Sequence, residues 1–117
     1  MINLLVDESY AFDYLSILLT KESINDNEQN KSNANICSDF IESQIGKELM
    51  LKIIVSPEFR KLNEANRITY QLVEKIRYQE GGKVTGKDVD NANMDRYYAK
   101  KELQKKFFNT DITEKKS

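Results

Sequence analysis

The chain has 117 residues, of which 39% are hydrophobic and 32% are charged, and its formal net charge is −1. This length suffices for one domain with a hydrophobic core but not for two. The chain has no histidine and one cysteine, Cys37, which excludes an internal disulfide framework, a zinc site of the usual kind and Ser-His-Asp catalysis.

The sequence pattern also favours neither a membrane span nor a signal peptide. No apolar run approaches the roughly 20 residues that span a membrane. Residues 1–6 are apolar, but no basic region precedes them and Asp7 and Glu8 follow at once, which argues against a signal peptide. We therefore expect a cytoplasmic protein with no membrane partner, no metal and no cofactor.

The first helix is expected from Asp7 or Ser9 to about Glu22. Residues 2–6 form a run too short to decide between a strand and a lead-in to this helix. Residues 23–35 are rich in Asn, Asp and Ser, which compete with helical backbone bonding and predict a flexible loop. The predicted inner face of the helix consists of Tyr10, Ala11, Tyr14, Ile17, Leu18 and Lys21, with Asp13 and Leu15 at its edges.

Two further helices are predicted next, over residues 35–55 and 57–80. Gly46 weakens the middle of the first by up to about 1 kcal/mol, and we expect close packing against a neighbour to explain it. Ser56 and Pro57 form a strong start signal for the second, because serine caps the first amides and proline has no amide to lose. Gly81 and Gly82 predict its end.

The last helix is expected over residues 87–108, after a capping box formed by Thr85 and Asp88. Residues 109–117 are predicted to be a disordered tail, which leaves one domain over residues 1–108. Four helices with short later links predict an all-α fold, an antiparallel bundle of about four helices.

Polar side chains interrupt the predicted buried faces of these helices. At about 100° per residue, Asn66, Arg77 and Glu80 share a face with apolar residues of the 57–80 helix. Burying such groups is costly unless they find partners. We therefore expect one polar site between the helices, made of Asp13, Lys21, Asn66, Glu74, Arg77, Glu80, Asn93, Arg96 and Lys100.

Two interpretations of this polar site stay open. The arginines can pair with carboxylates inside the bundle and set helix register, or they can line a pocket for an anion, since guanidinium suits carboxylate and phosphate. Metal binding is not favoured, because Glu74 and Glu80 are six residues apart on different faces. No catalytic residue is assigned.

Charge is unevenly placed along the chain. Residues 1–58 hold 4 basic and 10 acidic side chains, a net charge of −6, whereas residues 59–117 hold 14 and 9, a net charge of +5. This predicts that the acidic half packs against the basic half. A basic surface with nearby aromatic residues could also bind nucleic acid, but the acidic overall charge does not favour that partner.

Residues 13–21 (DYLSILLTK) resemble the opening D-K-L/I-S/T-I-L-E-I/L-K of a group of small helical domains of unknown function. Those domains are often encoded near, or fused to, glycosyltransferases. The group also tends to show the spacing of Asn66, Tyr70, Glu74, Ile76, Arg77 and Glu80, and later that of Asn93, Arg96 and Lys100. The chain departs from the group at Tyr14 and Leu19, where the group has Lys and Glu. Because no activity is established for the group, the resemblance implies a fold but no reaction.

The sequence favours a non-enzymatic interaction or accessory module that binds a protein partner or self-associates, for example as a homodimer. The alternative is a small-molecule binding protein or enzyme that acts on an anionic ligand, which is phosphorylated, sugar-linked or a dicarboxylate. In that alternative the ligand would occupy an Arg/Lys/Asn-lined pocket between helices.

Overall fold

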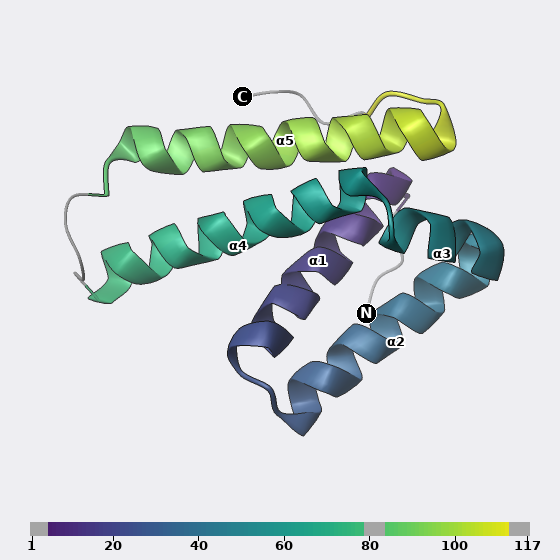
Figure 1. The fold of residues 1–117 in the computed structure, drawn as a ribbon, viewed down its shortest axis with the longest axis horizontal. Coiled ribbons are helices and arrows are strands. Elements are labelled where there is room, and N and C mark those ends of the chain that lie inside the picture. Colours follow the sequence, from purple (N-terminus) through teal and green to yellow (C-terminus); the bar gives the residue numbers. More distant parts are fainter. Residues whose placement is uncertain (1–4, 79–83, 113–117) are drawn as a thin grey trace.

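The computed structural model describes residues 5–78 and 84–112, and every regular element within them is an α-helix. The all-α class is therefore confirmed. Figure 1 shows α1 lying beside α2, and α4 beside α5, as two antiparallel pairs that the short α3 connects. The helices are α1 (Glu8–Ile24), α2 (Glu28–Ile45), α3 (Lys47–Ile54), α4 (Pro57–Tyr78) and α5 (Gly86–Phe108).

The predicted flexible loop over residues 23–35 is wrong for most of its length. Only residues 25–27 separate α1 from α2. Asn27 caps α2, because its side-chain oxygen accepts from the backbone amide of Asn30 at 2.8 Å. The Asn30 side chain in turn donates to the Asn25 carbonyl at 2.6 Å. The asparagines that predict a loop are therefore used at the start of α2, where Asn27 caps the helix and Asn30 bonds to the preceding turn.

Gly46 divides the predicted 35–55 helix into α2 and α3, so the structure has five described helices rather than four. Its φ of +91° lies in a region that side chains with a Cβ rarely adopt. A Cβ at this position would meet nothing within 4 Å, so the expected close packing is wrong. The glycine is needed for its backbone angle.

The start signals of α4 and α5 are confirmed. The Ser56 hydroxyl accepts from the Phe59 amide at 3.1 Å. Thr85 and Asp88 form a reciprocal capping box, with bonds of 3.2 Å and 2.9 Å. The hydrogen bond from the Thr85 backbone amide is the main cause that lowers the pKa of the exposed Asp88 carboxyl. The predicted stop at Gly81 and Gly82 lies outside the described residues.

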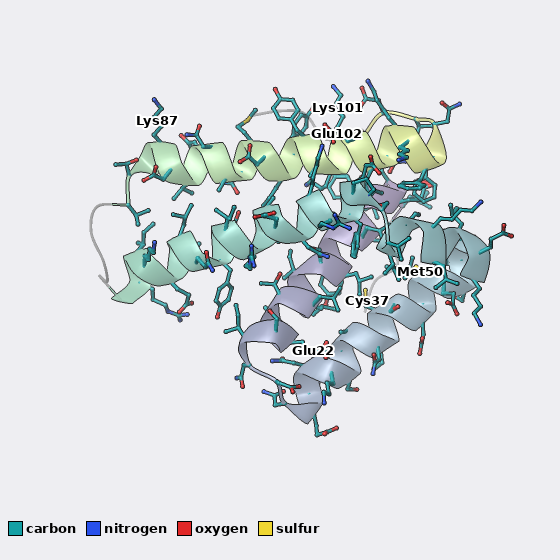
Figure 2. The ribbon with its side chains drawn as sticks, in the orientation of Figure 1. Glu22, Cys37, Met50, Lys87, Lys101 and Glu102 are labelled. Atoms are coloured by element: carbon teal, nitrogen blue, oxygen red, sulfur yellow. The ribbon has the colours of Figure 1, made fainter. Side chains whose placement is uncertain are left out.

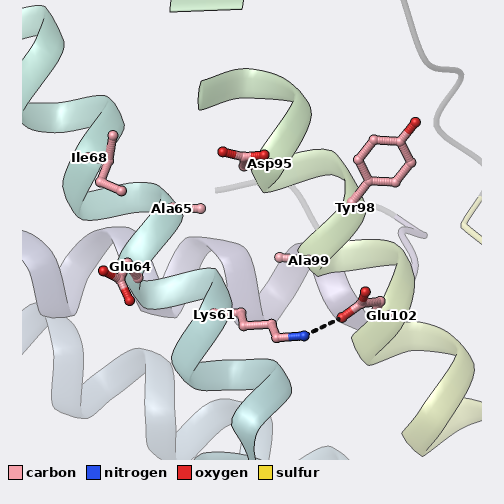
Figure 3. Close-up of a pocket in the computed structure, with 8 residues that line it drawn as sticks. All are labelled: Lys61, Glu64, Ala65, Ile68, Asp95, Tyr98, Ala99 and Glu102. Carbon is pink, nitrogen blue, oxygen red and sulfur yellow. Dashed lines mark hydrogen bonds and ion pairs between the residues drawn. The ribbon is translucent and has the colours of Figure 1, made fainter. Parts of the chain in front are cut away.

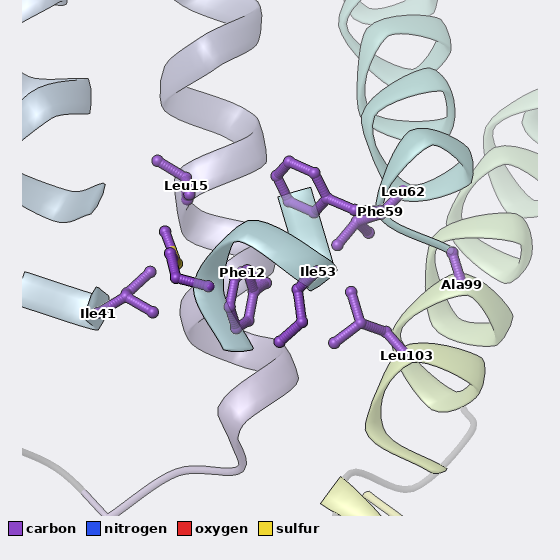
Figure 4. Close-up of a cluster of buried hydrophobic side chains, with 9 residues drawn as sticks. Phe12, Leu15, Ile41, Ile53, Phe59, Leu62, Ala99 and Leu103 are labelled. Atoms are coloured by element: carbon purple, nitrogen blue, oxygen red, sulfur yellow. The ribbon is translucent and has the colours of Figure 1, made fainter. Parts of the chain in front are cut away.

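One hydrophobic core contains buried side chains from all five described helices (Figure 4). The Phe12 and Phe59 rings meet edge to face, with centroids 5.9 Å apart. Cys37 packs against this core from α2 (Figure 2), and burial raises the pKa of its thiol. The buried members of the core are Phe12, Leu15, Ile41, Met50, Ile53, Phe59, Leu62, Ala99 and Leu103.

The predicted inner face of the first helix is partly wrong. Tyr14 keeps 59% of its surface exposed, and Lys21 is exposed too. Phe12, Asp13 and Leu15 are buried instead. The physical reason is that α1 packs against α2, α4 and α5, so more than one side of it is covered. A single apolar stripe is a poor guide to a helix with three neighbours.

The two ends of the described chain behave differently. Leu5 and Val6 are exposed and belong to no helix or strand, while residues 1–4 lie outside the described range. After α5, Ile112 is buried at 9% exposure, and Thr110 accepts a hydrogen bond from Gln104. Thr110 and Ile112 of the predicted tail therefore contact the domain. Residues 113–117 are not described.

None of the described helices combines the length and the apolar character that a membrane crossing needs.

The two described glycines make a matched pair for testing the break between α2 and α3. Gly46→Ala should lower the free energy of unfolding by about 1–2 kcal/mol, because Ala resists a positive φ. Gly86→Ala, at the start of α5 and also with nothing near its Cβ, should raise it by a few tenths of a kcal/mol. Urea unfolding followed by circular dichroism measures both. Equal effects would contradict this account of Gly46.

Candidate functional site

Asp13 of α1 lies at the centre of a buried polar network between three helices. One of its carboxylate oxygens accepts from the Asn66 amide of α4 at 2.9 Å, and the other accepts from the Arg96 guanidinium of α5 at 3.1 Å. The Lys100 ammonium lies 3.9 Å from that second oxygen. Four of the nine predicted site residues therefore meet, as the sequence predicts.

The network extends to Ser16, one turn along α1 from Asp13. Asn66 donates to the Ser16 hydroxyl at 2.9 Å with the same nitrogen that reaches Asp13, so both amide hydrogens are used. Asn66 is 4% exposed and Ser16 is fully buried. Groups this deeply buried are stable only when they are paired, so the network holds α4 in one register against α1.

Lys100 is almost fully buried, at 6% exposure. Its ammonium lies 4.7 Å from the centre of the Tyr10 ring, a cation–π contact with α1. Together with Arg96, it brings two cations of α5 to the Asp13 carboxylate. The attraction offsets part of the cost of removing these charges from water.

Sequence reasoning missed Gln104, which is fully buried in α5. Its side-chain oxygen accepts from the Ser9 backbone amide at 2.8 Å, an amide in the first turn of α1 with no partner inside that helix. Its side-chain nitrogen donates to Glu8 and Thr110 at 3.0 Å and 2.9 Å. Arg96, Lys100 and Gln104 are four residues apart and share one face of α5. This spacing predicts that Gln104 faces the same neighbours as the two cations.

Of the predicted site residues that the structure describes, four do not join the network. Lys21 and Asn93 are exposed. Arg77 is exposed too and lies 3.9 Å from Glu74 on its own helix. Glu80 lies outside the described residues. The cause is visible in Figure 1, where the C-terminal part of α4 and the N-terminal part of α5 extend beyond α1, so their stripes have no third helix to meet.

A cavity of about 210 Å³ opens beside the network, between α1, α4 and α5. The hydroxyls of Thr20 and Thr69 in its wall donate to backbone carbonyls of their own helices, at 2.9 Å and 2.8 Å. Several polar groups in its walls therefore already have hydrogen-bond partners. The Arg96 Nε, in contrast, is buried with no acceptor among the described residues. The lining residues are Ile17, Thr20, Asn66, Thr69, Tyr70, Val73 and Arg96.

A second cavity, of about 290 Å³, lies on the outer side of the α4–α5 pair (Figure 3). The Lys61 ammonium and the Glu102 carboxylate bridge it at 3.4 Å, and both are more than half exposed. Exposed ion pairs of this kind contribute little. Ile68 and Tyr98 add apolar walls without any group poised for chemistry.

The arrangement has limited chemical scope. Within residues 5–78 and 84–112, no three His, Cys, Asp or Glu side chains are grouped so that they could hold a metal ion. The Asp13 carboxylate is 10% exposed, and both of its oxygens already accept hydrogen bonds. Such a carboxylate is poorly placed to take a proton from a substrate, which needs direct contact.

Comparisons with protein-family models, with curated proteins and with solved structures find no match to this chain. The resemblance to helical domains found near glycosyltransferases therefore stays a prediction. What can be said of function comes from the geometry of the site and of the surfaces around it.

Asp13 and Glu74 offer a matched comparison, because each pairs with an arginine. Asp13→Ala should lower the free energy of unfolding by about 3 kcal/mol, since it leaves Arg96 and Lys100 without their buried acceptor. Glu74→Ala should cost less than about 0.5 kcal/mol, because its partner Arg77 is exposed. Urea denaturation measures both. If Asp13→Ala lowers the free energy of unfolding as little as Glu74→Ala does, the network does not stabilise the fold as we describe.

Proposed function

We propose that this chain is a non-enzymatic helical interaction module of the cytoplasm, and that it binds another polypeptide in the groove between α1 and α4. The groove is defined by the residues that line the 210 Å³ cavity. Ile24 and Ile76 are exposed further along α1 and α4. One observation carries the proposal. The inner stripe of α4 continues, with helical spacing, beyond the point where the chain's own helices cover it.

Burial along α4 changes at Asn66. Phe59, Leu62 and Asn66 are 2%, 0% and 4% exposed. Val73, two turns further on the same face, is 48% exposed, and the neighbouring Ile76 is 51% exposed. The sequence thus keeps an apolar stripe over a length that the described fold leaves half uncovered. Such an uncovered apolar face is typical of a surface that meets a partner.

The facing wall on α1 has the same character. Asp13, Ile17 and Ile24 share one face, and exposure rises along it from 7% at Asp13 to 50% at Ile24. Because α1 and α4 diverge from their meeting point at Asp13 and Asn66 (Figure 1), both stripes open into the same wedge. A wedge with two apolar walls suits the apolar face of a helix, the arrangement by which groove-binding helices are recognised.

A photo-crosslinking amino acid at Val73, in chain expressed in its natural host cells, tests the proposal. We expect a discrete adduct with another polypeptide, and the adduct should disappear when Tyr70→Asp places a charge in the groove. The control places the same amino acid at Lys105, which is exposed on α5 and outside the groove, and should give no such adduct. No adduct at Val73, or an adduct that ignores Tyr70→Asp, contradicts the proposal.

An anionic small molecule is the second candidate occupant, favoured by the position of Arg96 at the cavity wall and by its unmatched Nε. A thermal-shift series with inorganic phosphate, succinate and uridine diphosphate glucose tests it. Binding should stabilise the fold by about 2.7 kcal/mol at 100 times the dissociation constant, and Arg96→Met should abolish the shift. No shift with any of the three rules out this second candidate.

A further inference from the structure

We propose that the occupant of the groove is a second copy of this chain, which inserts the outer face of its α2. This inference rests on the proposed interaction function and names its partner. Three features carry it, namely an uncovered apolar pair on α2, the division of charge between the two halves of the chain, and two unpaired charges of opposite sign beside the surfaces that would meet.

The outer face of α2 carries two large apolar side chains that the described fold leaves uncovered. Ile36 is 65% exposed and Phe40 is 61% exposed. They are four residues apart and therefore adjacent on one face of the helix. The opposite face of α2 is used inside the fold, where Ala34 and Ile41 are buried. The helix is thus apolar on two sides, although only one of them is covered.

The division of charge makes the surface of the chain self-complementary. Residues 1–58, which contain α1, α2 and α3, have a net charge of −6, whereas residues 59–117 have a net charge of +5. A second copy that turns its α2 toward α4 brings a helix of the acidic half against a helix of the basic half, and the other wall of the groove, α1, belongs to the acidic half. Complementary potentials of this kind favour encounter and orient the two partners. A two-fold axis would let each copy fill the groove of the other.

Two charged side chains of opposite sign belong to the helices that would meet in this contact. Lys21 is exposed on α1 and follows Thr20, which lines the groove, and Asp39 is exposed on α2 and precedes Phe40. Neither side chain makes an ion pair with the residues that the structure describes. α3 also has an exposed apolar end, but its Lys52 is already paired with Glu48 at 3.7 Å. An ion pair between Lys21 of one copy and Asp39 of the other would satisfy both. This charge match selects α2 over α3 as the inserted element.

Sedimentation equilibrium of the full chain from about 1 µM to 1 mM tests the inference, a range that spans weak to moderate affinity. The unaltered chain should form a dimer. Phe40→Asp and Val73→Asp should each leave a monomer with an unchanged circular dichroism spectrum, because both side chains are exposed. A chain that stays monomeric, or a dimer that survives both substitutions, overturns the inference.

A charge exchange tests the pairing itself. Lys21→Glu and Asp39→Lys should each weaken the dimer by about fivefold or more, and the two substitutions together should restore it. Lys105→Glu, which reverses an exposed charge elsewhere, should leave the dissociation constant unchanged. Failure of the double variant to restore the dimer overturns the inference.

The outcome can be separated from that of the proposed function. A monomeric chain that still crosslinks through Val73 to a different protein overturns the second copy as occupant and leaves the interaction module standing. A chain that neither dimerises nor crosslinks contradicts both.

Discussion

The fold depends on the buried carboxylate of Asp13. It accepts from Asn66 of α4 and from Arg96 of α5, and it lies close to Lys100, so one side chain of α1 is bonded to both members of the other helical pair. Apolar packing favours contact between helices but is tolerant of sliding, whereas a buried hydrogen-bonded charge is satisfied in one arrangement only. The network therefore fixes the position at which α1 and α4 meet and beyond which they diverge.

The divergence of α1 from α4 leaves exposed the surface to which we assign function. Beyond Asn66 the inner stripe of α4 has no third described helix to cover it, because α1 diverges from α4 there. The polar network closes the inner end of the wedge and the apolar side chains line its opening. A closed polar end with an apolar opening suits the binding of a helix better than the binding of an ion, because most of its donors, though not the Arg96 Nε, already have acceptors.

The sequence predicts the helical class, the caps at Ser56 and Thr85 and the meeting of Asp13, Asn66, Arg96 and Lys100, because each follows from local chemistry or helical spacing. The predicted network wrongly includes Lys21, Glu74, Arg77 and Asn93, since a helical period indicates which face is inward but not how far along a neighbour reaches. The break at Gly46 was missed because glycine within an apolar helix pattern also fits close packing, and only its backbone angle distinguishes the two.

Amide hydrogen exchange along α4 at low and at high protein concentration tests the central claim most directly. The account predicts strong protection up to Asn66 at both concentrations, and weak protection over residues 70–78 that rises as the second copy fills the groove. Uniform protection along α4 at low concentration, or weak protection over residues 70–78 that does not rise with concentration, would contradict it.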